Sequence, residues 1–295
     1  MTSKITPTEA DTFLAARPRL FAAAYRMLGT VSDAEDILQE AYLRWQNVTK
    51  DTVRDPVGYL MRITTRLCLD QLKSARVKRE VYPGEWLPEP ILTDDPVEAL
   101  DHDVSVALML ALERLTPLER AAFLLHDVFD CDYSEVATAL DRSEASCRQL
   151  TTRARRNVQR EKPRAQIDRQ KGEDVARAFF AASKTGDTQT LMHLLAKDVQ
   201  LISDGGGKAM AALNPIVGRD RTLRLIEGLV RKQGGTIPKD WAVCQLNGLP
   251  AIVSHEVDGI VQASSLEIVD GRIHRIYVVR NPDKTRHLAR ILNSK

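Results

Sequence analysis

The pattern of apolar and polar residues in the first 80 positions has the period of amphipathic α-helices. Between Ala34 and Trp45, apolar residues recur at offsets of 0, 3, 4, 7, 8 and 11, which places them on one helix face. Ser32, with Glu35 three residues later, predicts a capping box at the start of this helix. The opposite face carries a polar and acidic group that consists of Asp36, Gln39 and Glu40.

A longer helix is predicted to begin near Pro56 and to end in a basic stretch. The aliphatic residues expected on its buried face are Leu60, Ile63, Leu67 and Leu72. Residues 81–96 follow, and their four prolines and one glycine predict a linker rather than a helix. Because this linker also contains Trp86 and several aliphatic residues, we expect part of it to pack against another segment.

A second helical block extends from about residue 97 to residue 162. Thr116, Pro117 and Glu119 form a helix start signal, with a threonine cap, a proline at the first helical position and a glutamate at the third. Residues 134–160 then show a short helix, a tight break and a longer helix rich in arginine. This is the pattern of a helix-turn-helix whose second helix enters the DNA major groove.

The second helix of this motif is predicted to have an inner and an outer face. Ser143 is a suitable cap, and apolar residues at offsets of 0, 3, 7 and 11 from Cys147 face the core. Serine, glutamine and arginine near the helix start can contact base edges, and the later arginines suit phosphates. The alternative is an ordinary solvated helix. The candidate DNA-binding residues are Ser143, Ser146, Arg148, Gln149, Thr152, Arg153, Arg155 and Arg156.

From about residue 173 the pattern becomes mixed. The predicted elements are helices at 173–184, 188–196 and 217–233 and a strand at 199–203. After Trp241, apolar and polar residues alternate, and the turn dipeptides Asn247-Gly248, Asp258-Gly259 and Asp270-Gly271 divide the alternating runs. They predict an antiparallel meander after helices. The fold class is therefore multidomain, with all-α domains followed by an α+β domain.

Composition refines this picture. The 295 residues are enough for two or three domains, and the net charge of +2 is unevenly distributed. Residues 81–112 carry seven acidic groups and no basic group, whereas residues 142–164 carry eight basic and two acidic groups. This contrast suggests a DNA-binding face and an acidic linker that could shield it. The four separated cysteines predict neither a metal site nor a disulfide framework, and the absence of a signal peptide or a long apolar stretch predicts a cytoplasmic protein without membrane segments.

Three stretches in the helical part resemble the bacterial extracytoplasmic-function (ECF) sigma factors. SDAEDILQEAYLRW at 32–45 resembles their region 2.2, and DPVGYLMRITTRLCLDQLKSARVKRE at 55–80 resembles regions 2.3 to 2.4. The sequence from Thr116 to Val158 resembles region 4. Asp141 stands where relatives commonly have glycine, and aspartate tolerates the left-handed conformation that this turn requires.

The resemblance implies a division of labour. Asp36, Gln39 and Glu40 would contact the clamp helices of core RNA polymerase. The helix from about 57 to 79 would recognise and melt the −10 element of promoter DNA, and the second helix of the helix-turn-helix would recognise the −35 element. The candidate backbone contacts in the first of these helices, each of which could instead be a solvated surface residue, are Arg62, Arg66, Lys73 and Arg76.

Residues 173–295 resemble a SnoaL-like domain of the NTF2-like fold, in which a curved sheet and helices enclose a cavity. A subgroup of ECF factors carries this domain, and the motifs WLPEP, DGGGK and NPDK support the match. The resemblance implies regulation from within the chain, in which Trp86 and rigid prolines plug an apolar groove and three glycines permit close backbone approach. The residues expected at this interdomain contact are Trp86, Leu87, Pro88, Asp204, Gly205, Gly206, Gly207, Lys208, Asn281, Pro282, Asp283 and Lys284.

The sequence thus predicts a non-enzymatic sigma factor with core RNA polymerase and promoter DNA as partners and with no cofactor. A small-molecule ligand could occupy the C-terminal cavity. Two alternatives remain, a ligand-responsive helix-turn-helix repressor and an enzyme that turns over a small molecule in that cavity. The expected domains are 1–80 (region 2), 81–103 (acidic, proline-rich linker), 104–164 (region 4) and 171–295 (SnoaL-like regulatory domain).

Overall fold

The computed structural model divides the chain into two compact units. The first unit comprises Met1–Glu80 and Leu100–Lys162, and the second comprises Val81–Ala99 and Pro163–Lys295. The proline-rich linker therefore groups with the C-terminal part of the chain. The structure describes residues 9–49, 53–80, 82–93, 105–158 and 168–293, without the side chains of residues 9 and 74–80. Among these residues, no helix has the combination of length and apolarity that a membrane span needs.

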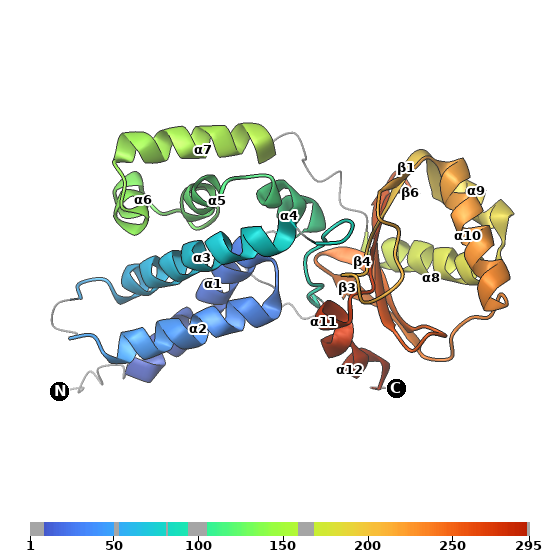
Figure 1. The fold of residues 1–295 in the computed structure, drawn as a ribbon, viewed down its shortest axis with the longest axis horizontal. Helices are drawn as coiled ribbons and strands as arrows, with labels where there is room; N and C mark the ends of the chain where they lie inside the picture. The colour runs from blue at the N-terminus through green and yellow to red at the C-terminus, as the bar shows by residue number, and fades with distance from the viewer. Residues whose placement is uncertain (1–8, 50–52, 81, 94–104, 159–167, 294–295) are drawn as a thin grey trace. The chain divides into compact units, whose positions relative to one another are not determined.

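The first unit begins with three packed helices, α1 (Glu9–Leu28), α2 (Val31–Gln46) and α3 (Pro56–Glu80) (Figure 1). The predicted apolar face of α2 is confirmed, because five of its six residues, including Ala34 and Trp45, are buried. The predicted buried face of α3 is confirmed as well, since all four of its aliphatic residues are buried. Helical periodicity alone was sufficient to identify both faces.

The predicted start of α2 at Ser32 is wrong. The helix begins at Val31, and Thr30 is its N-cap residue, so Ser32 lies inside the first turn. The reason is in the backbone, because Gly29 adopts a left-handed φ of 78° directly before the cap and ends the preceding helix there. The Thr30 hydroxyl donates to the Asp33 carboxylate at 2.5 Å instead of accepting a backbone hydrogen bond.

The other half of the first unit contains the helix-turn-helix. Its elements are α4 (Val106–Glu113), α5 (Pro117–Phe123), the π-helical turn η2 (Leu124–Val128), α6 (Tyr133–Leu140) and α7 (Glu144–Val158). The predicted capping box at Thr116 is confirmed, with its hydroxyl bound to the Glu119 amide and the Glu119 carboxylate bound to the Thr116 amide. A second capping box, Asp132 with Glu135, starts α6 and was not predicted.

Two buried arginines connect α1 to the second half of this unit. The Arg26 guanidinium is fully buried, 5.5 Å from the centre of the Phe129 ring. Arg120 is 3% exposed and donates to the Met27 carbonyl at 2.5 Å and to the Glu113 carboxylate at 2.7 Å. Because a buried guanidinium is costly without such partners, these contacts favour one arrangement of the two halves in this structure.

The second unit is an α+β domain in which α8, α9 and α10 cover one face of a six-stranded sheet (Figure 1). The strand order is β2-β1-β6-β5-β4-β3. Its elements are α8 (Arg169–Thr185), α9 (Thr188–Leu194), β1 (Leu195–Asp204), β2 (Ile216–Val217), α10 (Arg219–Gln233), β3 (Trp241–Leu246), β4 (Leu249–His255), β5 (Val261–Val269), β6 (Arg272–Val279), α11 (Pro282–Thr285), η4 (Arg286–Leu288) and α12 (Ala289–Leu292). The predicted fold class is confirmed.

The predicted meander corresponds to β3–β6, which pair antiparallel in sequence order. Asn247-Gly248 and Asp270-Gly271 have positive φ at both residues, as a two-residue type I′ hairpin requires. At Asp258-Gly259 only the glycine has positive φ, because the connection there is longer. The sequence did not predict that β1 runs parallel to β6, nor that β1 extends to both sides of the predicted strand.

The linker adds to the edge of this sheet. Leu92 forms a bridge with Leu246 of β3, and the Thr93 amide donates to the Gln245 carbonyl at 3.0 Å. The Asn247 amide donates to the Ile91 carbonyl at 2.9 Å. These bonds cover backbone groups that an edge strand would otherwise leave unpaired. The prediction that part of the linker packs against another segment is confirmed.

Candidate functional site

Helix α7 has the geometry of a helix-turn-helix recognition helix. Asp141 makes the turn with a left-handed φ of 54°, as its tolerance for this conformation predicts. The Ser143 hydroxyl then accepts a hydrogen bond from the Ser146 amide at 3.3 Å and so caps the helix. Of the four residues predicted to face the core, Cys147 and Ala154 are fully buried, whereas Leu150 and Val158 are only half-buried. Thr151, which the sequence pattern did not single out, is buried between Cys147 and Ala154. The opposite face therefore remains free to contact another molecule.

The side chains on the outer face of α7 differ in their exposure and in how firmly the protein binds them. Gln149, Thr152, Arg153 and Arg156 are exposed. The Thr152 hydroxyl nevertheless donates to the Arg148 carbonyl at 2.8 Å, and the Arg153 guanidinium lies 4.0 Å from the Glu119 carboxylate. Arg155 instead makes two hydrogen bonds to the Asp127 carboxylate, at 2.8 and 2.5 Å, and these bonds raise its pKa above the usual value. Arg155 is thus held within the protein in this structure.

Arg148 and Ser146 lie near the start of the same helix. The Arg148 guanidinium forms an ion pair with Glu144 at 2.9 Å and lies 4.7 Å from the centre of the Tyr133 ring. Its side chain is still 55% exposed, so these contacts orient it without removing it from solvent. Ser146 is half-buried. Both remain candidates for contacts with DNA.

The polar face of α2 is presented to solvent. Asp36 and Gln39 are exposed, whereas Glu40 is half-buried and pairs with Arg44 at 2.8 Å. The neighbouring Glu35 is held by Arg17 at 2.7 Å. Asp36 and Gln39 are consequently the two residues of the predicted polymerase contact whose polar groups are most accessible.

The basic residues of α3 differ in their partners. Arg66 donates to the Thr138 and Ala139 carbonyls, both at 3.1 Å, at the C-terminal end of α6. This is where a cation interacts favourably with a helix. Lys73 forms an exposed ion pair with Asp70, and the side chain of Arg76 lies outside the described residues. Arg66 is therefore occupied within the first unit in this structure.

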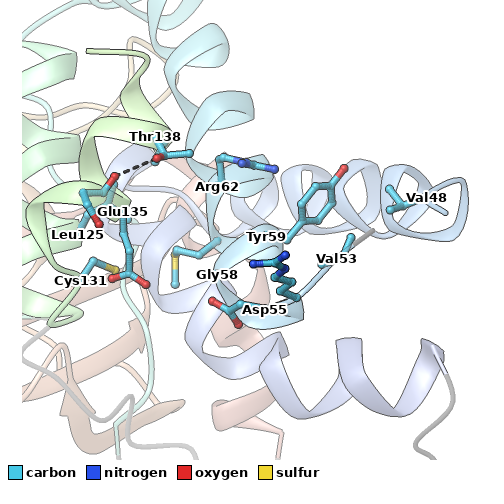
Figure 2. A pocket seen from close by; sticks show the side chains of 14 residues that line it. Val48, Val53, Asp55, Gly58, Tyr59, Arg62, Leu125, Cys131, Glu135 and Thr138 are labelled. Atoms are coloured by element: carbon cyan, nitrogen blue, oxygen red, sulfur yellow. Dashed lines mark hydrogen bonds between the residues drawn. The ribbon is translucent and has the colours of Figure 1, made fainter. Parts of the chain in front are cut away.

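A cleft of about 570 Å³ lies between the start of α3 and α6, together with the segment that precedes α6 (Figure 2). Tyr59 and Arg62 line one side, with the Arg62 guanidinium 4.9 Å from the centre of the Tyr59 ring. Cys131 and Glu135 line the other side, and burial raises the pKa of Cys131 to about 11. Residues 50–52, which precede α3 in the sequence, are outside the described residues.

In the second unit, three separated motifs meet at one buried carboxylate. Asp204, at the end of β1, is completely buried and accepts four hydrogen bonds. Its donors are the Tyr82 hydroxyl at 2.5 Å, the Leu87 amide at 2.9 Å, the Lys284 ammonium at 2.7 Å and the Gly206 amide at 3.0 Å. We call the group of Tyr82, Leu87, Asp204, Asn281 and Lys284 the linker clamp.

Lys284 is the cationic centre of the linker clamp. Its side chain is 6% exposed, and its ammonium group also donates to the Leu87 carbonyl at 2.5 Å. The same group lies 4.3 Å from the centre of the Trp86 ring, within cation–π range. Asn281 donates to the Tyr82 hydroxyl at 2.9 Å. Burial and the hydrogen bond to Asp204 raise the pKa of Tyr82, so its hydroxyl remains a donor.

The glycine motif permits the close backbone approach that the sequence predicted. Gly206 and Gly207 have left-handed φ values of 59° and 70°. A Cβ atom on Gly207 would lie 2.7 Å from Pro83 of the linker, and one on Gly206 would lie 2.2 Å from the Asn281 amide nitrogen. Only glycine therefore fits at either position.

The predicted plug residue differs from the observed one. Trp86 is half-buried beneath the Lys284 ammonium, whereas Leu87 is 1% exposed and fills the apolar position. The difference arises because the flat indole ring contacts a cation on one face and does not enter the core. Pro88 is buried next to Leu87, Lys208 and Asp283 form an exposed ion pair at 2.5 Å, and Pro282 begins α11.

Several contacts of the linker were not predicted, including those of Tyr82 described above and those of His287 and Asn247. The His287 ring nitrogen Nε2 lies 2.9 Å from the Pro90 carbonyl, and the Asn247 side chain accepts from the Ile91 amide at 3.0 Å. His287 and Asn247 do not belong to the three motifs, and no spacing in the sequence connects them to the linker. Such contacts become visible only when the fold brings the segments together.

Comparisons with known proteins match both helical regions of the first unit and most of the full chain. Residues 12–77 match the family Sigma-70 region 2, and residues 105–158 match the family Sigma-70, region 4. The chain is 38% identical to the ECF RNA polymerase sigma factor SigJ of Mycobacterium tuberculosis, over 94% of this chain and 93% of that protein. It is 32% identical to the probable ECF sigma factor SigI of the same species, over 90% and 91% of the two chains.

The three-dimensional fold is also similar to a solved structure. The crystal structure of M. tuberculosis SigJ matches with a TM-score of 0.76 and 36% identity, covering 93% of this chain and 97% of that chain. The chain therefore belongs to the ECF RNA polymerase sigma factors. Members of this family bind core RNA polymerase and promoter DNA and direct transcription initiation, and the matches support neither a repressor nor an enzyme.

Proposed function

We propose that the surfaces of this sigma factor are divided as the sequence suggests. Residues 1–80 contact the clamp helices of core RNA polymerase through Asp36, Gln39 and Glu40 and engage the −10 element through α3. Residues 104–164 recognise the −35 element through α7. The exposure of Gln149, Arg153 and Arg156 supports this assignment, because side chains of these types contact base edges and phosphates. With these partners, the protein would act in the cytoplasm.

The −10 element would be engaged next to the cleft at the start of α3. Tyr59 offers an aromatic face there, and the Arg62 guanidinium already stacks near it. Single-stranded bases bind to such faces with roughly 1–3 kcal/mol for each stacked base. The other candidates for backbone contacts are Arg66, Lys73 and Arg76, of which Arg66 would first have to leave the end of α6.

Residues 171–295 would regulate this activity through the linker clamp. The supporting observation is the buried Asp204–Lys284 pair, which binds the chain segment that connects α3 to α4. The positions −10 and −35 place the two promoter elements about 25 base pairs apart, which is about 85 Å at 3.4 Å per base pair. Release of residues 82–93 adds up to about 40 Å of extended chain to the linker. A closed clamp would thus limit how far regions 2 and 4 can separate on DNA.

Run-off transcription with core polymerase tests this regulation. Asp204→Asn removes the charge that holds Lys284, and Asp283→Asn is the matched control because its ion pair with Lys208 is exposed. At equal occupancy of core polymerase, we expect Asp204→Asn to raise promoter output at least about fivefold, within the usual range of coupling between sites, and Asp283→Asn to leave it unchanged. Equal output from both variants, with the linker of Asp204→Asn shown to be released, would overturn the proposal. We also propose that a small molecule in the C-terminal domain acts on this clamp.

A further inference from the structure

The α+β domain contains a cavity between its helices and its sheet. The cavity has a volume of about 300 Å³, at the lower end of the roughly 300–1,000 Å³ that small-molecule sites occupy. Most of its wall is apolar, with Phe179 from α8, Leu229 from α10 and Ile276 from β6 among the lining residues. A well-formed apolar cavity with a few polar groups is the usual form of a ligand site.

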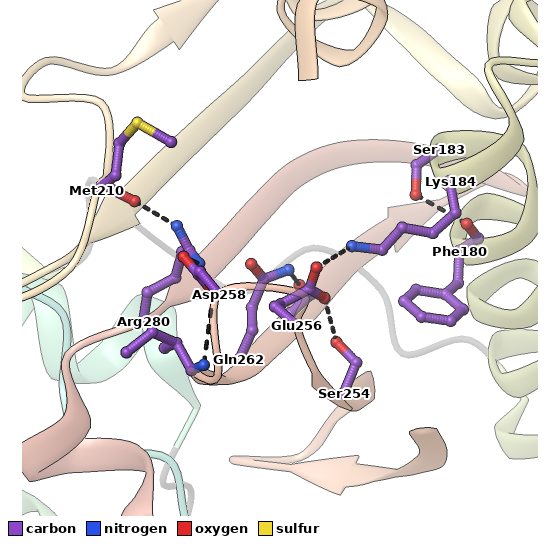
Figure 3. Close-up of polar contacts among 11 residues, drawn as sticks. Phe180, Ser183, Lys184, Met210, Ser254, Glu256, Asp258, Gln262 and Arg280 are labelled. Carbon is purple, nitrogen blue, oxygen red and sulfur yellow. Dashed lines mark hydrogen bonds and ion pairs between the residues drawn. The ribbon is translucent and has the colours of Figure 1, made fainter. Parts of the chain in front are cut away.

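The charged groups in the wall are already paired with one another (Figure 3). Lys184 and Glu256 form an ion pair at 2.6 Å, and their side chains are 14% and 3% exposed. The Arg280 guanidinium donates to the Asp258 carboxylate and to the Met210 carbonyl, both at 2.6 Å. The Arg280 Nε atom is buried without a hydrogen-bond partner among the described residues, but the charge of each group is balanced by its ion pair. A charged ligand would therefore meet no unbalanced charge among these groups and would lose its hydration on entry.

Neutral hydrogen-bonding groups complete the wall. Gln262 donates to the Ser264 hydroxyl at 3.1 Å, which uses only one of the four hydrogen-bonding positions of a glutamine amide. Ser203 lies on the neighbouring part of the sheet and binds the backbone of Ala212. The cavity is therefore suited to an apolar molecule that carries a neutral polar group such as a hydroxyl or a carbonyl.

The cavity wall and the linker clamp share the same chain segments. Ser203 lines the cavity and directly precedes Asp204, and Arg280 lines it and directly precedes Asn281. Residues of the loop at 205–213 lie both at the cavity and against the linker. Met210 lines the cavity, while Gly207 lies against Pro83, and the Leu213 backbone lies 3.3 Å from where a Cβ atom on Gly84 would be.

We propose that this cavity binds a neutral, predominantly apolar small molecule and that its occupancy changes how tightly the clamp holds the linker. The coupling rests on the proposed regulatory function, whereas binding in the cavity does not. Thermodynamic linkage makes the coupling reciprocal, so full release of the linker changes ligand affinity by the same factor by which the ligand changes the equilibrium of linker release.

Two fluorescent probes with a common aromatic skeleton test the ligand class in the full-length protein. N-phenyl-1-naphthylamine is neutral, and 8-anilinonaphthalene-1-sulfonate adds a sulfonate group. We expect saturable one-to-one binding of the neutral probe and at least roughly tenfold weaker binding of the sulfonate, because its charge would be buried without a partner. Equal affinity for both probes, or no saturable binding of the neutral probe, would overturn the proposed ligand class.

Matched tryptophan variants locate the site. Leu229→Trp places a larger side chain into the cavity, whereas Val257→Trp adds the same side chain at a position that is 64% exposed and outside it. We expect Leu229→Trp to weaken binding of the neutral probe at least about tenfold, since the cavity has little spare volume, and Val257→Trp to leave it unchanged. A circular dichroism spectrum confirms folding of both. Equal affinity in the two variants would place the probe elsewhere and refute the site.

The coupling between the cavity and the linker clamp can be measured without polymerase. We expect Asp204→Asn to change the affinity for the neutral probe by about fivefold or more, within the usual range of allosteric coupling, and Asp283→Asn to leave it unchanged. Bound probe should change amide exchange in residues 82–93 by the same factor. If the probe binds in the cavity but neither quantity changes, the coupling is wrong. If both change while transcription does not, the cavity inference stands and the proposed regulation fails.

Discussion

Replacement of Asp204 by asparagine should release the linker from the C-terminal domain. The substitution keeps the size of the side chain but removes the negative charge that faces the Lys284 ammonium at 2.7 Å. Both groups are buried, with side-chain exposures of 0% and 6%. Removal of one partner of a buried ion pair costs about 3–5 kcal/mol, because the other charge stays buried without compensation. The linker can avoid this cost by detaching and letting Lys284 reach water.

Hydrogen exchange measured by mass spectrometry follows this release directly. The Leu87 amide donates to Asp204, and the Thr93 amide donates to β3, so both are protected while the linker is held. A loss of about 3 kcal/mol corresponds to roughly 100-fold faster exchange, at about 1.4 kcal/mol per factor of ten. Peptides from β4 and β5 in the same digest report whether the domain itself remains folded.

Asp283→Asn is the control for this experiment. Its ion pair with Lys208 is as short, at 2.5 Å, but the two side chains are 53% and 56% exposed. Exposed ion pairs contribute about 0.2–1 kcal/mol to stability. Loss of this pair should therefore accelerate amide exchange in residues 82–93 by at most about fivefold. The account of the clamp is refuted if Asp204→Asn and Asp283→Asn give the same exchange, or if the linker in Asp204→Asn stays as protected as in the wild-type chain.

Four further predictions concern the first unit. Gln149→Ala and Arg153→Ala should each weaken binding to promoter DNA by about 1–3 kcal/mol and relax the sequence preference. Arg156→Ala should lower the affinity for all sequences and reduce the slope of log affinity against log salt concentration by about 1. Gel-shift titrations at several salt concentrations check these effects, and unchanged affinity would contradict them. Asp36→Lys should reduce binding to core polymerase in a pull-down titration without shifting the urea midpoint, since Asp36 is exposed; a shifted midpoint would instead indicate a structural role. Thr116→Ala should destabilise the first unit by about 1 kcal/mol in urea unfolding, whereas Ser32→Ala should have almost no effect, because only Thr116 caps a helix. Burial raises the pKa of Cys131 to about 11, so its alkylation by iodoacetamide in the folded protein should keep accelerating from pH 8 to pH 10. In the urea-unfolded chain the alkylation rate should instead level off near the ordinary thiol pKa of about 8.5. Identical pH profiles would show that Cys131 is not buried as described.

Helix faces were predictable because burial repeats with the helical period. The inner faces of α2 and α3 follow from the spacing of their apolar residues, whereas only two of the four residues predicted on the inner face of α7 are buried. Start signals were less reliable. Thr116 was identified correctly, but Ser32 was not, since the left-handed backbone at Gly29 sets the start of α2 and no side-chain pattern records it.

Partners across long sequence distances were not predictable. Tyr82 and Asp204 are 122 positions apart, and His287 and Pro90 are 197 apart. The motifs suggested which segments meet, but the central role of Asp204 depends on the end of β1 lying next to α11, which in turn depends on the unpredicted parallel pairing of β1 with β6. Likewise, the sequence pattern assigned Arg155 to DNA because it could not reveal Asp127 as its partner.

The partners of a candidate residue also changed its expected function. Ser143 and Arg66 were proposed as DNA contacts, yet one caps α7 and the other binds the end of α6. A capping serine can still reach DNA, because helix N-termini commonly approach the phosphate backbone. Arg66 would have to exchange two carbonyl partners for phosphate. The exposed residues Gln149, Arg153 and Arg156 are consequently the better first targets for mutation.

We propose that this chain directs core RNA polymerase to promoters through α2 and α7 together. Single-round transcription from cloned promoter DNA, with purified core polymerase and the full-length chain, tests it most directly. We expect a transcript with a defined start that requires the chain. This transcript should be lost both with Asp36→Lys and with the Gln149→Ala, Arg153→Ala double variant, although both variants fold. The same transcript from core polymerase alone, or wild-type levels from both variants, would contradict the claim.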